Sequence, residues 1–475
     1  QGEIRKRMDL VAGTNKQRLL LALVATGVAG IVALQLFKKK ERRTPPPSAK
    51  ATLFQFIAGM TGGQMHEFLI EQFQKSGNIF RLPIPGVVVV ANADDARAIY
   101  KDPLTTKPRA MYGALDSFSS GPNILTISSG DAWHHRRKGI NPAFAPKLVK
   151  RMNAVALEKA DKWVSERLVP LMEKGESFDA GTEMILVTVS VICKAAFEYD
   201  ISHQESKEMH EAMRDSVEEF SIKSMVNPMR QFGTWMLPER RQAFCQAEKL
   251  KVFAYKIIDL YRKRESPAAD TVIDLMVKNS NYKDDSERVP DIIMLLFAGH
   301  DTTGYTLAFS LLELSKNPGE QQKLRERLSS AEGTPYLKAV LNETMRLHTV
   351  SPLSAIKQLG RDFVSKDGYF IPKGSIAFIA QVALARDPVL FPNPHEFQPY
   401  RWLNATDSAK QALFPFSLGN RNCVGQALAN AELSSMVPRL IRQFEFTVEE
   451  EGCIETQGTR RLNGCELKAT RIPTS

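Results

Sequence analysis

The sequence predicts a mainly helical protein with a smaller region of short strands, preceded by a transmembrane helix. Residues 146–264 and 290–317 carry the apolar periodicity of helices. Short runs bounded by Gly and Pro predict strands within residues 79–90 and 360–378. Residues 19–37 contain only two polar side chains, which is typical of a segment that crosses a hydrocarbon core.

Composition and charge describe an ordinary globular protein with a basic balance. The 475 residues are 43% hydrophobic and 24% charged, enough for a large core in one large domain or in several smaller ones. Lys and Arg number 63 against 53 Asp and Glu, and the net charge of +10 suits an anionic membrane or an acidic partner. The basic residues are dispersed, without zinc-finger spacing, so nothing supports binding to nucleic acid.

Cysteine usage argues against a disulfide framework. The chain has five cysteines, an odd number, and no two of them lie in C-x-x-C spacing: Cys193, Cys245, Cys423, Cys453 and Cys465. This sparse set favours a reducing compartment. Histidine precedes glutamate at residues 66, 210 and 395, but none of these pairs continues to the H-E-x-x-H motif of zinc proteases.

The first 52 residues predict a membrane anchor and its flanks. Residues 1–18 form a tail, and residues 19–37 form an uncleaved helix of about 28 Å, at about 1.5 Å per residue. Residues 38–52 form a basic and Pro-rich linker, which by the positive-inside rule places residues 53–475, expected as one folded domain, in the cytosol. Basic residues in the tail weaken this orientation, and an organelle transit peptide is the alternative.

The region after the linker alternates short elements. Ile79–Leu82 and Val87–Val90 predict strands around a Pro-Gly turn, and Asp94–Tyr100 predicts a helix. Residues 113–122 predict a Gly- and Ser-rich loop, of a kind that often shapes substrate pockets.

One further helix carries a polar pair. Gly130 opens this helix, and Trp133 and Arg137, four residues apart, share one of its faces. An Arg on a solvated helix face is the ordinary explanation, so the pair by itself indicates no function.

A long helix predicted over residues 290–317 has an unusual polar stretch at its centre. Pro in the first turn predicts its start. Residues 298–303 read Ala-Gly-His-Asp-Thr-Thr, and Asp301, Thr302 and Gly299 are poor helix formers. The hydroxyl can bond the carbonyl one turn back, and the glycine would let a flat ligand approach closely. A polar helix–helix contact is the alternative explanation.

Downstream residues suggest a buried ionic network and a helix break. Glu343 and Arg346 are three residues apart and share a helix face. Arg401 follows in the segment Pro-Tyr-Arg-Trp. Pro438 predicts a kink or a stop within the last helix.

The most specific motif surrounds Cys423. Residues 416–425 read F-x-x-G-x-R-x-C-x-G, and an apolar helix is predicted over residues 426–442. The thiol therefore lies in a Gly-permitted loop just before a helix N-terminus, a setting that lowers a thiol's pKa. A thiolate is a ligand for haem iron or another soft metal. A single Cys is more often a small buried hydrophobe, but five fixed positions together are rare by chance.

These motifs, in this order, resemble the cytochrome P450 family of haem-thiolate monooxygenases. The resemblance covers about residues 53–471, with an anchor of the microsomal type before them. It implies the family's fold, a mostly helical body with a smaller strand-rich lobe. It also implies haem b (iron protoporphyrin IX) as cofactor.

The resemblance assigns roles to the residues of each motif. Cys423 would be the axial ligand of the haem iron, and the residues that bind the cofactor would be Cys423, Trp133, Arg137, Arg421, Phe416 and Gly299. Asp301 and Thr302 would be catalytic, delivering protons from solvent. A structural network would join Glu343, Arg346 and Arg401. Lys357 stands where the family commonly has an Arg that binds a haem propionate, without the bidentate fork of an Arg.

The resemblance also implies an activity and its partners. The protein would insert one atom of O2 into an apolar organic substrate, with electrons from NADPH through a flavoprotein reductase whose acidic face suits a basic chain. It would lie in the endoplasmic reticulum membrane, in contact with lipid, with a plastid or mitochondrial membrane as the alternative. A haem-thiolate isomerase or dehydratase that does not use O2 remains a rival, as does a non-enzymatic single-span membrane protein.

Overall fold

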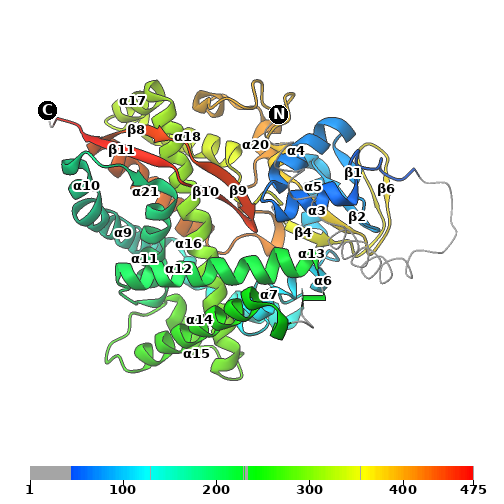
Figure 1. Ribbon diagram of the computed structural model, residues 1–475, viewed down its shortest axis with the longest axis horizontal. Helices are drawn as coiled ribbons and strands as arrows, with labels where there is room; N and C mark the ends of the chain where they lie inside the picture. The colour runs from blue at the N-terminus through cyan, green and yellow to red at the C-terminus, as the bar shows by residue number, and fades with distance from the viewer. Residues whose placement is uncertain (1–43, 129, 228, 231–233, 354, 474–475) are drawn as a thin grey trace.

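The computed structural model describes residues 44–473, except 129, 228, 231–233 and 354 (Figure 1). The predicted tail at 1–18, the anchor at 19–37 and the start of the linker lie outside the described residues. Among the described helices, α11 (Ala180–Phe197) is long and apolar enough to cross a membrane, but 83% of it is buried inside the protein. It is the kind of helix that forms the core of a folded domain.

Helices make up most of the molecule and surround α16 (Asp285–Lys316), at 32 residues about 48 Å long. The other helices of this body are α8 (Asp131–Ile140), α9 (Pro146–Trp163), α10 (Val169–Lys174), α11, α12 (His203–Glu218), α14 (Pro238–Arg262), α15 (Val272–Lys278), α17 (Pro318–Arg327), α18 (Gly333–Leu347) and α21 (Gln426–Gln443). Figure 1 shows α16 running through the centre of the body, crossed by α12. One large apolar cluster fills this body.

Shorter helical segments connect these elements. They are α3 (Leu53–Thr61), α4 (Met65–Ser76), α5 (Ala93–Lys101), α6 (Arg109–Tyr112), α7 (Leu115–Ser119), η1 (Asn141–Phe144), η2 (Val164–Leu168), η3 (Glu219–Lys223), α13 (Ser224–Val226), η5 (Thr234–Met236), α19 (Gln381–Leu384), η6 (Pro399–Trp402), α20 (Asp407–Ala412) and η7 (Gly419–Arg421). The segment predicted as a loop at 113–122 thus contains the short helix α7, so that prediction is wrong in part.

A smaller lobe is built on a four-stranded sheet in the order β1-β2-β7-β4, at the right of Figure 1. Its strands are β1 (Ile79–Arg81), β2 (Val87–Val90), β4 (Ala355–Gln358) and β7 (Ile376–Ile379); β2 and β7 are parallel and the other pairs antiparallel. All four valines of β2 are buried, Val88 and Val90 in one apolar cluster and Val87 and Val89 in another. Both faces of the sheet are covered, which explains a continuous apolar run.

The remaining strands form a three-stranded sheet and two hairpins. The sheet has the order β3-β11-β8, from β3 (Phe178–Asp179), β8 (Phe444–Glu450) and β11 (Glu466–Arg471). The hairpins pair β9 (Cys453–Gln457) with β10 (Thr459–Asn463), and β5 (Phe363–Val364) with β6 (Phe370–Ile371). A helical body with a smaller strand-rich lobe confirms the predicted fold class.

Two predictions based on proline need correction: α16 does not start at Pro290, and α21 does not stop at Pro438. α16 begins at Asp285 rather than at Pro290, because the Asp284 side chain caps the helix by accepting from the Ser286 N–H at 2.8 Å. α21 continues through Pro438 to Gln443. Pro438 is buried, so packing holds the helix together despite the missing N–H.

Candidate active site

The loop before α21 holds Cys423 in a fixed conformation. The Cys423 N–H donates to the Phe416 carbonyl at 2.9 Å, which closes the loop. Gly419 has φ +75°, and a Cβ there would lie 2.4 Å from the Tyr100 carbonyl oxygen. Only glycine fits that position. Phe416 is partly buried against the main core.

Opposing effects act on the pKa of the Cys423 thiol. Burial raises its pKa, while the N–H groups of Gly425 and Gln426 and the charge of Arg137 favour the thiolate. The expectation that the helix N-terminus lowers this pKa is therefore wrong for the net shift, because desolvation outweighs the backbone N–H groups. The side chain nevertheless keeps exposed surface area, so the sulfur is accessible although protein surrounds it closely enough to raise its pKa. A bound metal cation is what would hold such a sulfur as thiolate.

Four basic side chains gather beside this loop. Arg137 on α8 donates to the Asn422 carbonyl at 2.8 Å, and Arg421 donates to the Ile127 carbonyl at 2.9 Å. Lys107 donates from Nζ to the Leu125 carbonyl at 3.1 Å, and Arg421 donates to the same carbonyl at 3.2 Å. The fourth side chain, Lys357, is buried on β4 and shares the electrostatic field of Arg421.

The charges of this basic cluster (Lys107, Arg137, Lys357 and Arg421) are uncompensated. None of the four forms an ion pair with a carboxylate among the described residues, and Arg421 Nη1 is buried without a hydrogen-bond partner. Burial lowers the pKa of Lys357 to about 8, with help from Arg421, and burial lowers the pKa of Arg421 to about 10. Desolvated cations without anions form a binding site for negatively charged groups.

These features fit haem b. A thiol that can bind a metal cation lies beside a cluster of cations that can bind anions. An iron porphyrin with two carboxylates offers both a metal cation and the anions. Trp133 lies on α8 with Arg137 and packs against the basic cluster. Its buried ring lies under the Arg421 guanidinium, 4.2 Å from the ring centroid, and so positions that side chain.

Sequence reasoning did not find Lys107. It lies in an ordinary Thr-Thr-Lys-Pro stretch with no motif around it, and only the fold brings it to Leu125 and Arg421. No signal in a single sequence marks it. Lys357, which the resemblance places where an Arg commonly binds a haem propionate, lies within the basic cluster, near Arg421.

The middle of α16 has one face that other elements leave uncovered. Ala298 is exposed and Thr302 is partly exposed, whereas almost every residue around them is buried. The Thr302 hydroxyl donates to the Ala298 carbonyl at 3.0 Å, as predicted for a hydroxyl that bonds one turn back. Gly299, predicted to admit a ligand, also has a packing role. A Cβ there would lie 2.8 Å from Ile192 on α11, so the glycine permits close packing of the two helices.

Asp301 and Thr302 are adjacent in sequence but point in different directions. Asp301 is buried and accepts a hydrogen bond from the Thr459 hydroxyl on β10. Its electrostatic neighbours are His300 and Tyr305. Consecutive helix residues do not face each other, so the described contacts do not join the carboxylate to the Thr302 hydroxyl.

Glu343, Arg346 and Arg401 come together in one buried network. Arg346 donates to both Glu343 oxygens at 2.8 Å, and Arg401 donates to Oε1 at 2.9 Å; Glu343 and Arg346 are fully buried. Two donors were not anticipated, the Trp402 indole at 2.8 Å and the Gln398 N–H at 2.9 Å. This carboxylate is saturated with donors, which fits a scaffold role.

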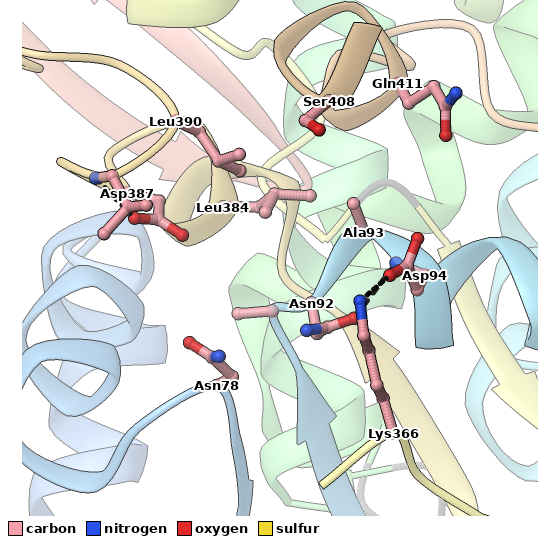
Figure 2. Close-up of a pocket in the computed structure, with 12 residues that line it drawn as sticks. Asn78, Asn92, Ala93, Asp94, Lys366, Leu384, Asp387, Leu390, Ser408 and Gln411 are labelled. Carbon is pink, nitrogen blue, oxygen red and sulfur yellow. Dashed lines mark hydrogen bonds and ion pairs between the residues drawn. The ribbon is translucent and has the colours of Figure 1, made fainter.

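A surface pocket lies elsewhere in the molecule. Figure 2 shows polar side chains around it, including the Lys366–Asp94 ion pair, Asn78 and Asn92. None of the predicted site residues lines this pocket. The candidate active site is therefore the interior region between the Cys423 loop, the basic cluster and α16.

Comparisons with known proteins give the same picture. The family model described as "Cytochrome P450" matches residues 45–465. The chain is 28% identical to "Probable cytochrome P450 4s3" of Drosophila melanogaster over 443 residues, 84% of this chain and 86% of that protein. It is 25% identical to human "Cytochrome P450 2J2" over 460 residues, 88% and 89% of the two chains, and 25% identical to "Cytochrome P450 3A12" of Canis lupus familiaris over 375 residues, 72% of each.

Proposed function

This chain belongs to the cytochrome P450 family of haem monooxygenases, and from that membership we propose that it hydroxylates an apolar organic substrate. One atom of O2 would enter the product and the other would leave as water. The two electrons would come from NADPH through a flavoprotein reductase, and two protons would be taken from solvent. Residues 53–475 would form the catalytic domain.

One observation carries the proposal: the Cys423 thiol lies beside two buried cations, Lys107 and Lys357, and two partly buried ones, Arg137 and Arg421. None of the four has a carboxylate partner among the described residues. Cys423 would ligate the haem iron. The basic cluster would hold the propionates, with Trp133 supporting Arg421. Phe416, whose carbonyl accepts from the Cys423 N–H, would help to hold the cysteine loop at the cofactor. Bound haem supplies the iron at which O2 is activated and a substrate bond is oxygenated.

The residues on α16 would manage protons and water. Thr302 presents a hydroxyl on the inward-facing surface of the helix, where it could hold a proton or a water molecule. Asp301 would take protons from the β10 side. To pass them to Thr302, the carboxylate would have to leave the Thr459 hydroxyl, or a water molecule would have to bridge the two residues.

Partners and location are proposed from charge and apolar surface. The net charge of +10 suits an acidic reductase face. Phe54 on α3, Met229 and Met236 are exposed apolar side chains, and α13 just before Met229 packs against α3. α3 begins at Leu53, directly after the predicted linker in the sequence. We place the protein in the endoplasmic reticulum membrane, with this surface against lipid.

Isotope labelling tests the proposed reaction. Sterols, fatty acids and terpenoids are first screened for a substrate-induced change in the haem spectrum of the purified full chain. A hit is then incubated with NADPH, a reductase and ¹⁸O2. The proposal predicts one labelled atom in the product and none when O2 is removed. Turnover that persists without O2, with no label incorporated, would instead establish the isomerase or dehydratase class.

A further inference from the structure

Two histidines and an aspartate converge behind the active-site face of α16. His210 on α12 is half-buried, and His300 and Asp301 on α16 are buried. One ligand atom from each lies within 4.8 Å of the others. His210 Nδ1 and His300 Nε2 lie 3.4 Å apart, with the two rings perpendicular.

The hydrogen bonds around this cluster fix which atoms carry lone pairs. His300 Nδ1 lies 2.8 Å from the Leu296 carbonyl, which can only accept, so Nδ1 carries the proton and Nε2 presents a lone pair. The Thr459 hydroxyl orients the Asp301 carboxylate. A backbone carbonyl on the outer nitrogen of an imidazole and a hydroxyl on the carboxylate are the contacts that support metal ligands in proteins.

We propose that His210, His300 and Asp301 form a binding site for a divalent first-row transition metal ion, with zinc as the reference ion. Zinc–nitrogen bonds of about 2.0–2.1 Å place two tetrahedral nitrogens about 3.4 Å apart, which matches the His210–His300 separation. The ligand atoms lie within 4.8 Å of one another, so the carboxylate needs to move by at most about 1.4 Å toward the imidazoles to complete the set. The ion would fasten α12 to α16.

Nearby guanidinium groups set a limit on the affinity. Arg461 and Arg214 act on His210, and Arg461 also acts on His300. Arg461 donates from Nη1 to Gln457 at 3.1 Å, while its Nε and Nη2 are buried without a hydrogen-bond partner among the described residues. Because this positive charge repels a metal dication, replacing Arg461 with a neutral side chain tightens binding.

Metal binding has a consequence for catalysis, and only this consequence rests on the proposed function. A metal ion on Asp301 removes the carboxylate from proton delivery to Thr302. Zinc therefore acts as an inhibitor that leaves haem binding intact and diverts electrons from NADPH to reduced oxygen species. Metal binding itself does not depend on this role.

The test measures zinc bound to the haem-loaded full chain by equilibrium dialysis with elemental analysis. Wild type binds one zinc ion that His210→Ala and His300→Ala do not retain. The matched control His203→Ala removes an exposed histidine at the start of the same helix, α12, and binds zinc as wild type does. Arg461→Gln binds zinc about tenfold tighter or better. Copper(II) added in place of zinc gives an electron paramagnetic resonance spectrum with splitting from two imidazole nitrogens.

Folding of each variant is verified by its haem spectrum and melting temperature. His210→Asn, at a half-buried position, is the second variant if His300→Ala does not fold. Unchanged zinc stoichiometry in the His210 variants would overturn the proposal. The absence of bound zinc in wild type would also overturn the proposal. If the His210 variants then still lost coupling of NADPH oxidation to product, His210 and His300 would form a hydrogen-bonded proton path without a metal site.

Discussion

The Arg137 guanidinium is bonded to both the backbone and the side chain of Asn422, the residue directly before Cys423. It donates to the Asn422 carbonyl at 2.8 Å and to Oδ1 at 3.1 Å, and its Nε donates to Asn141 at 2.8 Å. One planar fork thus ties α8 to the cysteine loop. A Lys cannot reproduce these three bonds from a single ammonium group.

Arg137→Lys should therefore loosen the Cys423 loop and weaken haem retention about 10- to 100-fold. The rate at which haem transfers to an acceptor protein measures this effect. Lys138→Ala, which changes an exposed residue of the same helix, should transfer haem at the wild-type rate. Equal rates for Arg137→Lys and wild type would show that the fork does not hold the loop.

Thr302→Ala should leave haem binding unchanged and reduce product formation per NADPH about tenfold or more, because the inward-facing hydroxyl is lost. NADPH oxidation continues and hydrogen peroxide accumulates. The matched control is Thr306→Ala, one turn along α16, whose buried hydroxyl bonds the Thr302 carbonyl at 2.8 Å. Coupling that stays at the wild-type level in Thr302→Ala would remove this residue from the proton path.

Glu343→Ala should cost about 3–5 kcal/mol of unfolding free energy, because it leaves the fully buried Arg346 without its carboxylate. Urea unfolding followed by circular dichroism gives the value. Lys338→Ala, at an exposed position of the same helix α18, serves as control. A loss below about 1 kcal/mol would mean that the carbonyls of Ala385, Pro394 and Glu396 satisfy Arg346 alone.

Asp291 should give the stability a measurable pH dependence. Burial raises its pKa from 3.8 to about 6, against the opposing effects of Arg136, Tyr282 and the Ile124 N–H. Between these two values the folded carboxyl holds a proton that the unfolded chain has released. The stabilisation from this proton is complete below pH 3.8 and is lost as the pH rises through 6.

Asp291→Asn removes this titration. The unfolding free energy of wild type minus that of the variant should fall by at most about 3 kcal/mol between about pH 4 and pH 6. Denaturant unfolding at several pH values checks the sign. A difference that rises with pH across this window would show that Arg136 and Tyr282 hold the carboxyl ionised.

Local sequence predicted much of the fold. β1 and β2 are confirmed where a Pro-Gly turn separates apolar runs, and α21 is confirmed directly after the Cys423 loop. The predicted start at Pro290 and the predicted stop at Pro438 failed because propensity is a local quantity. Pro290 lies inside a helix that an earlier cap begins, and Pro438 lies in a helix that tertiary packing holds.

Contacts between distant segments could not be predicted from single motifs. Lys107 reaches the site through loop carbonyls, and Trp402 completes the shell of Glu343. Gly299 matches a motif, yet its space is filled by Ile192 from another helix. Motifs name the chemistry at a position, whereas side-chain direction depends on what packs against the element.

The spectrum of the reduced protein under carbon monoxide tests the central claim, that Cys423 ligates haem iron. The account predicts a red-shifted, thiolate-type Soret band in wild type and in Cys245→Ser. This control changes an exposed cysteine that is distant from Cys423 in the sequence. Cys423→Ala should lose this band. A wild-type protein without the band, or a Cys423→Ala protein that keeps it in full, would contradict the account.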